Sequence, residues 1–403
     1  MMVHYREIKG NSRVFYAVLS VLLVIILVAL WATHHMEGEG HYITGMTNQI
    51  VWGMPHVFAV FLIVAASGAL NIASISSVFG KAIYKPLARL SGLLAIAMLA
   101  GGLAILVLDL GHPDRLIVAM TSYNFKSIFA WNIFLYTGFI AIVAVYLWMM
   151  MEDKMNRYTK IVGFGAFIWR LLLTTGTGSI FGFLVARQAY DEAVMAPMFV
   201  ALSFAYGLAV FIIVLVVASY STGRPLGDRI LQRLKNLLVV FIGAALYFVL
   251  VFHLTNLYAT EHHGVERFLL SGGLYSRIFW FGQVFLGGIL PIILFLLPAT
   301  ANCRMTLVLG SALVILGGLA QMYVVIIGGQ AYPLVLFPGM TESSSFFDGQ
   351  IHPYHPSYYE FLLGLGGVAL AGVLVMIGTK VLRFLPESLA DEVIDPHFSK
   401  KAQ

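Results

Sequence analysis

The chain has 403 residues, of which 60% are hydrophobic and only 11% charged, and its mean hydropathy is +0.89. This composition excludes an ordinary soluble domain, which needs far more polar surface to face water. Apolar runs of about 18 or more residues recur along the whole length, whereas a cleaved signal peptide would supply one short run at the start. The sequence therefore predicts an all-α integral membrane protein.

Charge and cysteine content exclude further classes. The net charge of +5 would hint at nucleic acid in a soluble protein, but here the basic residues sort by loop, as membrane topology requires, so we expect no nucleic-acid partner. Cys303 is the only cysteine. The protein by itself therefore cannot ligate an iron–sulfur cluster, attach a c-type haem through a cysteine pair or form an internal disulfide.

Ten segments are long and apolar enough to cross a bilayer as helices. In chain order they are 14–32, 51–75, 90–110, 127–150, 161–186, 195–219, 236–258, 275–297, 305–328 and 358–382. Most of the 24 lysines and arginines fall on alternate connecting segments, beginning with the N-terminal one. Since cytoplasmic loops retain basic residues, both termini are predicted to be cytoplasmic, in the inner membrane of a bacterium or archaeon.

An internal repeat indicates how these spans are grouped. Residues 54–60 resemble 196–202, and residues 128–134 resemble 278–284. Chance similarity between apolar helices is the alternative, but the repeat favours two same-sense four-helix bundles, spans two to five and six to nine, flanked by the first and last helices. The expected organisation is an N-terminal helix and outer loop (1–50), a first bundle with the functional site (51–190), a second bundle (191–304 and 305–328), and an outer loop, final helix and cytoplasmic tail (329–403).

Ionisable residues within the spans are scarce and gather toward the outer side. His56 follows Pro55 at the start of the second span, and Asp109 ends the third span shortly before His112 and Arg115. An intramembrane ionisable group is costly and is by default a functional candidate. Histidine and aspartate beside an apolar wall would suit a quinone head, which needs a hydrogen bond at each ring oxygen and acceptors for two protons. In the alternative interpretation Asp109 forms an interfacial ion pair with Arg115, and His56 binds only backbone.

The fifth span carries Arg170 about nine residues, or roughly 14 Å, from its inner end, so this arginine should lie near mid-bilayer. Beyond it, Thr174, Thr175, Thr177 and Ser179 alternate with glycines. A hydroxyl-lined half helix would hold water and carry protons, but close helix packing through small residues explains the same pattern equally well.

Two further features bear on cofactors. A di-haem cytochrome needs four deep histidines, whereas only His56 and His253 lie within the spans and both are shallow, His253 beside Asn256. We therefore expect no haem, a single haem on these two histidines being a minor alternative. The outer loops are rich in histidine but lack a metal-ligand spacing, so solvated loops are favoured over zinc sites. The long loop at 329–357 has the composition of a cap or docking surface.

At these positions the sequence resembles the NrfD family, typified by the membrane subunit of polysulfide reductase. The resemblance covers about residues 50–300 and is carried by 52–68, 108–113, 127–132 and 175–182. The extra first and last helices and the motif Gly111-His112-Pro113 make the protein most similar to the DsrP type, found in DsrMKJOP-like complexes.

The resemblance implies a quinol site near the outer face of the first bundle, no bound redox metal, and docking to a ferredoxin-like iron–sulfur subunit outside. His56 and Asp109 match the family's quinone or proton-handling positions. Thr177 stands where some members have tyrosine, and His112 where many have arginine.

The resulting hypothesis is a membrane subunit of a respiratory or sulfur-metabolism oxidoreductase that exchanges electrons between menaquinone or ubiquinone and an outer iron–sulfur subunit. Proton handling is assigned to His56, Asp109 and Arg170, and quinone contact to His56, Asp109, His112, Arg115, Tyr123 and Thr177. Two alternatives remain open here: a proton or small-anion carrier, and a structural membrane anchor that binds no quinone.

Overall fold

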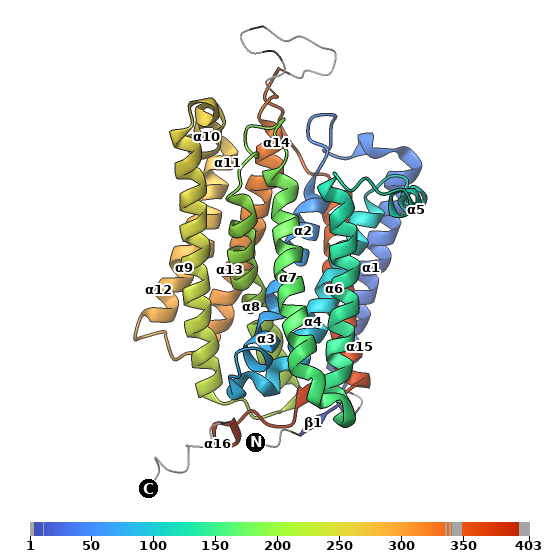
Figure 1. Cartoon of the computed structure of the whole chain (residues 1–403), viewed down its shortest axis with the longest axis vertical. Coiled ribbons are helices and arrows are strands. Elements are labelled where there is room, and N and C mark those ends of the chain that lie inside the picture. The colour runs from blue at the N-terminus through green and yellow to red at the C-terminus, as the bar shows by residue number, and fades with distance from the viewer. Residues whose placement is uncertain (1–3, 11, 335–336, 338–339, 341–348, 395–403) are drawn as a thin grey trace.

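The computed structural model describes residues 4–10, 12–334, 337, 340 and 349–394. Within these residues, ten helical stretches are long and apolar enough to cross a membrane. The ten predicted spans and the all-α integral membrane class are thereby confirmed. The helices run side by side along one axis (Figure 1). The part of the expected cap at 329–357 that covers 335–336, 338–339 and 341–348 lies outside the described residues.

Several spans consist of two or three consecutive helical segments. The spans are α1 (Arg13–Glu39); α2 (Met54–Ala69) with α3 (Asn71–Ser77); η2 (Ala82–Leu87) with α4 (Ala88–Leu108); α6 (Ile128–Met151); η4 (Asp153–Tyr158) with α7 (Thr159–Gly182); α8 (Met195–Thr222); α9 (Asp228–Tyr258); α11 (Gly273–Arg277), η6 (Ile278–Ile289) and α12 (Leu290–Leu296); α13 (Arg304–Tyr323), η7 (Val324–Gly328) and α14 (Gly329–Ala331); and α15 (Tyr358–Val381). Short elements between or beyond them are β1 (Tyr5–Arg6), η1 (His41–Ile43), η3 (Pro113–Arg115), α5 (Leu116–Thr121), η5 (Thr260–His262), α10 (His263–Leu270), β2 (Leu385–Pro386) and α16 (Asp391–Ile394). The ninth span continues to Ala331, so the outer loop begins three residues later than 329.

Helix α2 forms the centre of the molecule. It packs against α4 and α7, against α8 and α13 from the later half of the sequence, and against α15. The most apolar stretch of its span is 89% buried inside the protein, compared with 6% for α1, which packs mainly on α15. In a bilayer the exposed apolar side chains of α1 face lipid, so its hydrophobicity is satisfied without protein contacts.

The contact between α2 and α8 requires small residues. A Cβ atom at Gly68 would lie 1.6 Å from the carbonyl oxygen of Ser203, and one at Gly207 would lie 2.2 Å from the backbone of Gly68. Such backbone-to-backbone contact is the usual way in which helices associate tightly in a membrane. The two halves of the protein therefore meet along a glycine-mediated crossing at the core.

The two terminal segments are joined at one end of the molecule, here called the inner end; the end carrying α10 and α14 is the outer end (Figure 1). Strands β1 and β2 pair antiparallel there. The Arg224 guanidinium donates hydrogen bonds to the carbonyls of Arg6 and Glu7 on one segment and of Leu385 and Pro386 on the other. A single arginine thus satisfies backbone acceptors of both terminal segments.

Candidate functional site

A histidine–carboxylate pair lies at the outer end of α2 and α4. His56 occupies the first turn of α2, which begins with Pro55 in its first positions, where a missing N–H costs little. Asp109 is the residue that caps the C-terminus of α4. The His56 Nδ1 atom lies 3.0 Å from Asp109 Oδ2, with side chains 19% and 1% exposed. The packing of α2 on α4 thus brings together two residues that are distant in sequence.

The buried Asp109 carboxylate relies on His56 for its electrostatic stabilisation. Within the described residues neither carboxylate oxygen has a hydrogen bond of good geometry, and no lysine or arginine lies within ion-pair distance of them. A buried carboxylate needs a charge partner or a donor. The approach of the imidazole therefore provides the main stabilisation of the Asp109 carboxylate, and the ion pair between Asp109 and Arg115 that the alternative interpretation required does not form.

Aromatic rings flank the exposed part of the imidazole. The Trp52 ring stacks on His56 with centroids 6.1 Å apart and meets Phe181 edge-on at 5.8 Å. Phe129, at the start of α6, lies 6.1 Å from Trp52 and is 46% exposed. A partly exposed imidazole stacked on one aromatic ring and flanked by a second, exposed one suits a planar ring with polar edges.

A buried carboxylate on the last transmembrane helix supports the first turn of α2. Glu360 on α15 is fully buried and accepts hydrogen bonds from the backbone N–H groups of Gly45 and Ser357, at 2.9 and 2.7 Å. The Tyr354 hydroxyl donates to Glu360 and accepts from the Met54 N–H at 2.7 Å. Burial, with the Glu360 carboxylate, raises the pKa of the Tyr354 hydroxyl well above its usual range. This series of contacts fixes the backbone two residues before His56.

Gly53, between this support and His56, has no room for a side chain. A Cβ atom there would lie 2.3 Å from Glu360 Oε1 and 2.8 Å from the Tyr354 hydroxyl. Neither Glu360 nor Tyr354 was predicted from the sequence to belong to the site. The signal for Glu360 was available: Ser357 followed three residues later by glutamate is a capping box, and the structure forms it.

A second support joins the two halves of the protein at the outer end. The Gln330 side chain on α14 accepts from the N–H groups of Val51 and Trp52 and donates to the Trp52 carbonyl. The Arg187 guanidinium donates to the carbonyls of Gln330 and Gln49. The last helix of the second predicted bundle therefore holds the segment that leads into His56.

Three residues predicted to contact quinone do not join the His56–Asp109 pair. The side chains of His112 and Asp114 are mostly exposed, and His112 Nδ1 lies 3.7 Å from Asp114 Oδ1; Arg115 is exposed as well. Tyr123 stacks on Phe134 with centroids 4.4 Å apart. Across the described residues, His112, Arg115 and Tyr123 form no hydrogen bond, ion pair or ring contact with the His56–Asp109 pair. They border the outer surface near the pair.

Arg170 lies deeper along α7 than Thr177. Arg170 is fully buried, donates to Asn71 Oδ1 at 3.0 Å and to the Ser67 carbonyl at 3.4 Å, and lies over the Phe204 ring at 4.8 Å. Thr177 accepts from or donates to the Tyr136 hydroxyl at 3.4 Å and donates to the Leu173 carbonyl.

The Arg170 contacts fall where α2 gives way to α3. At this discontinuity the Ser91 hydroxyl of α4 accepts from the Ala73 N–H and donates to the Ala69 carbonyl. Backbone groups freed at a helix break inside a membrane need such partners. Arg170 therefore acts in the structure as part of a network that stabilises a discontinuous helix, apart from the His56–Asp109 pair.

The remaining histidines are dispersed. His253 pairs with Glu266 in the later half of the sequence, so His56 and His253 each face a different carboxylate. In the outer loops His262 binds the Gln188 carbonyl and His263 the Leu257 carbonyl. In the described ranges no group of three or more histidine, cysteine, aspartate or glutamate side chains is placed to hold a metal ion.

These features define a polytopic membrane protein of ten helices whose buried ionisable pairs lie toward one membrane face. Residues 42–333 match the family "Polysulphide reductase, NrfD". The protein belongs to this family, as the sequence motifs predicted.

Individual relatives are distant but match over most of their length. The protein is 27% identical to the integral membrane subunit of an Hdr-like menaquinol oxidoreductase from Archaeoglobus fulgidus, over 98% of its own length and 100% of that relative. It is 21% identical to the integral membrane subunit of menaquinone reductase from Nitratidesulfovibrio vulgaris, over 89% of each sequence. With the C subunit of polysulfide reductase from Wolinella succinogenes it shares 23% identity, over 71% of its own length and 96% of the relative.

Proposed function

We propose that this protein is the quinone-interacting membrane subunit of a multi-subunit oxidoreductase, with the quinone head bound at His56 and Asp109. The observation that carries the proposal is the 3.0 Å pair between a partly exposed imidazole and a buried carboxylate, with the Trp52 ring stacked on the imidazole. The names of two relatives, a menaquinol oxidoreductase subunit and a menaquinone reductase subunit, support this substrate class and favour menaquinone over ubiquinone.

We assign a separate role to each residue of the pair. Because Nδ1 of His56 faces Asp109, the Nε2 atom is the one available to a ligand. A carboxylate at Nδ1 favours the tautomer with hydrogen on Nδ1 and a lone pair on Nε2. In quinol oxidation Nε2 accepts the proton of one ring hydroxyl and Asp109 stabilises the resulting imidazolium. The proton of the second hydroxyl passes to water at the outer end, and the two electrons leave for an acceptor on another subunit. In quinone reduction the same atoms donate the proton.

The partner and orientation complete the proposal. The protein is expected in a bacterial or archaeal cytoplasmic membrane with both termini cytoplasmic, because the basic residues concentrate at that side. The outer end would then carry a ferredoxin-like iron–sulfur subunit, and the finer assignment is a DsrP-like role in a DsrMKJOP-like complex. The relatives named as subunits of oxidoreductases support the existence of partner subunits.

Purification with native lipid tests this proposal. We expect the protein to co-purify with iron–sulfur subunits, and we expect a density map to place a quinone ring oxygen within hydrogen-bond distance of His56 Nε2. The lipid extract should contain quinone in near-stoichiometric amount. A map of the assembled complex with quinone bound elsewhere, and lipid tails filling the space beside Trp52, would refute the site.

One observation favours the carrier as a second candidate. The α2–α3 discontinuity with a buried arginine resembles the broken helices of transporters. However, Ser91 satisfies the backbone groups at the break, and two hydrogen bonds from the guanidinium go to Asn71 and Ser67. A carrier should purify alone and move anions or protons across vesicles without any redox substrate, which distinguishes the two candidates.

A further inference from the structure

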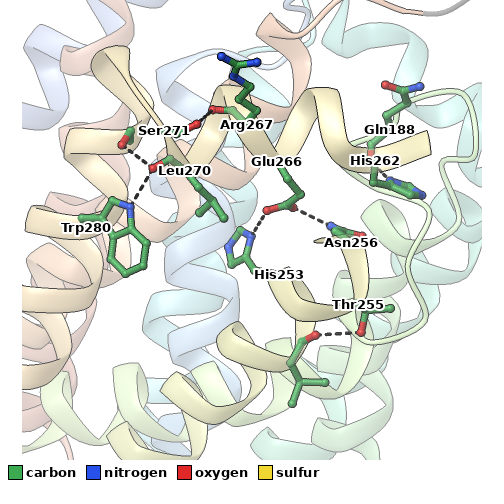
Figure 2. Close-up of polar contacts among 12 residues, drawn as sticks. Gln188, His253, Thr255, Asn256, His262, Glu266, Arg267, Leu270, Ser271 and Trp280 are labelled. Atoms are coloured by element: carbon green, nitrogen blue, oxygen red, sulfur yellow. Dashed lines mark hydrogen bonds and ion pairs between the residues drawn. The ribbon is translucent and has the colours of Figure 1, made fainter. Parts of the chain in front are cut away.

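A second buried histidine–carboxylate pair lies in the later half of the sequence. Figure 2 shows Glu266 of α10 between His253 and Asn256 of α9. Glu266 is fully buried, its Oε2 atom lies 2.8 Å from His253 Nδ1, and its Oε1 atom accepts from Asn256 Nδ2 at 2.9 Å. Because no lysine or arginine of the described residues pairs with Glu266, the charge of this cluster depends on how many protons it holds.

The charged and titratable surroundings of this cluster are modest. The elements packed on α10 are α9, η5, α11 and η6. From them His262 on η5 and Tyr275 on α11 are buried, whereas His263 and Arg267 on α10 itself and Arg277 on α11 are exposed. Burial raises the pKa of Glu192, on the segment between α7 and α8; His262 opposes this shift, and the Asp191 and Glu266 carboxylates add to it. Acidic groups thus outnumber buried cationic ones around Glu266.

Inward of this cluster lies a small cavity between the helices. It has about 30 Å³ of free space between α8, α9, η6 and α13 and is lined by Gln283 and Gln321 among apolar residues. Both glutamines are deeply buried, at 5% and 3% exposure. Within the described part of the sequence, the Gln283 amide nitrogen and oxygen and the Gln321 amide oxygen have no hydrogen-bond partner.

These unpartnered amides indicate bound water. A buried amide in a hydrocarbon environment is strongly disfavoured unless it is hydrogen-bonded. A water molecule needs roughly 10–15 Å³ of such space and two to four polar partners, and the cavity offers both. Gln283 also belongs to η6, a π-helical segment (Ile278–Ile289), and such segments occur frequently at functional sites.

The cavity lies inward of the His253–Glu266 pair along the same two helical segments, α9 and η6. Val249, which lines the cavity, lies one helical turn inward from His253 on α9. Gln283 lies one turn inward from Phe279, whose ring meets His253 edge-on at 4.7 Å. One turn of four residues is about 6 Å along a helix. The outer part of the cavity therefore begins about one turn beneath the imidazole.

We propose that His253, Glu266 and Asn256 form a proton-binding site in the later half of the sequence, connected to internal water held by Gln283 and Gln321. The step is the binding of one proton from water, shared between the imidazole and the carboxylate; no heavy-atom bond breaks and no electron moves. The site is separate from the quinone site at His56, and the proposal does not depend on that assignment.

Infrared difference spectroscopy of the purified complex, recorded between roughly pH 5 and 8 where histidine normally titrates, tests proton binding. We expect a carboxylic-acid or imidazolium band that grows on acidification and disappears in both Glu266→Gln and His253→Gln. Glu266→Asp should shift a carboxylic-acid band rather than remove it. This conservative variant provides the test if the other two variants assemble poorly. Glu261→Gln removes a nearby exposed carboxylate and should keep the band. Spectra of Glu266→Gln and His253→Gln that match the parent would overturn the proposal.

A density map that resolves water tests the internal connection. We expect at least one ordered water within hydrogen-bond distance of the Gln283 and Gln321 amides, and its loss in Gln283→Leu. Gln232→Leu, which changes a glutamine at the inner end of α9 far from the cavity, is the matched control and should leave that water in place. A dry cavity, or one filled by a lipid tail, would overturn this part of the proposal.

Discussion

Replacing Asp109 by asparagine isolates the charge in the His56–Asp109 pair. The substitution keeps the shape of the side chain and leaves a neutral amide beside the imidazole, so assembly should be preserved. It removes the negative charge 3.0 Å from Nδ1, in a side chain that is only 1% exposed. Without that charge the imidazolium that forms when Nε2 accepts a proton is less stable.

The size of the effect follows from the geometry. Two opposite unit charges about 4 Å apart attract each other by about 1 kcal/mol in water and about 4 kcal/mol near a protein surface, and about 1.4 kcal/mol corresponds to a tenfold change in rate. We therefore expect Asp109→Asn to lower quinol turnover by about 5- to 1,000-fold. His56→Gln removes the proton acceptor itself, for which general acid–base catalysis predicts a loss of about 10²- to 10⁴-fold. The histidine variant should be the more impaired of the two.

Quinol-dependent reduction of a soluble acceptor by the purified complex measures both losses. Subunit composition and iron content confirm that each variant is assembled. Asp114→Asn is the matched control, because this carboxylate lies shortly after Asp109 at the same end of the molecule but is 76% exposed. Turnover of Asp109→Asn that equals that of Asp114→Asn would refute the role of the pair.

Three further predictions concern the surroundings of the site. Gly53→Ala places a Cβ atom 2.3 Å from Glu360 Oε1, so the complex should unfold at lower temperature and lose quinol activity; unchanged melting in a thermal-shift assay would contradict the clash. Tyr354→Phe should lower the free energy of unfolding by about 1–3 kcal/mol, because hydrogen bonds to buried groups are lost. Because the pKa of Tyr354 is raised on folding, its contribution is present below about pH 10 and is lost as pH rises further, so parent and variant stabilities should converge in alkaline melts. Arg170→Ala leaves two buried acceptors without donors, each costing about 1–3 kcal/mol; a variant as stable as the parent would exclude Arg170 from the network at the α2 break.

Sequence pattern by itself determined the architecture. Helices that cross a bilayer must satisfy their backbone internally and present apolar side chains, so length and hydropathy along the sequence predict the ten spans without knowledge of their packing. The scarcity of charge within these spans made His56, Asp109 and Arg170 stand out, because each is costly in hydrocarbon and needs a partner. The family could also be predicted, since its motifs are local in sequence.

Only the tertiary structure decided the partners. Asp109 faces His56 rather than Arg115, and Glu266 and Glu360 proved to be fully buried although both lie at helix ends that resemble interfacial segments in the sequence. Hydropathy records how apolar a segment is but not which face of a helix contacts which neighbour. That choice depends on close packing, such as the glycine crossing of α2 and α8, which places distant residues together. Pairing of ionisable groups in a membrane protein is therefore a property of helix packing, whereas their depth along each helix is a property of the sequence.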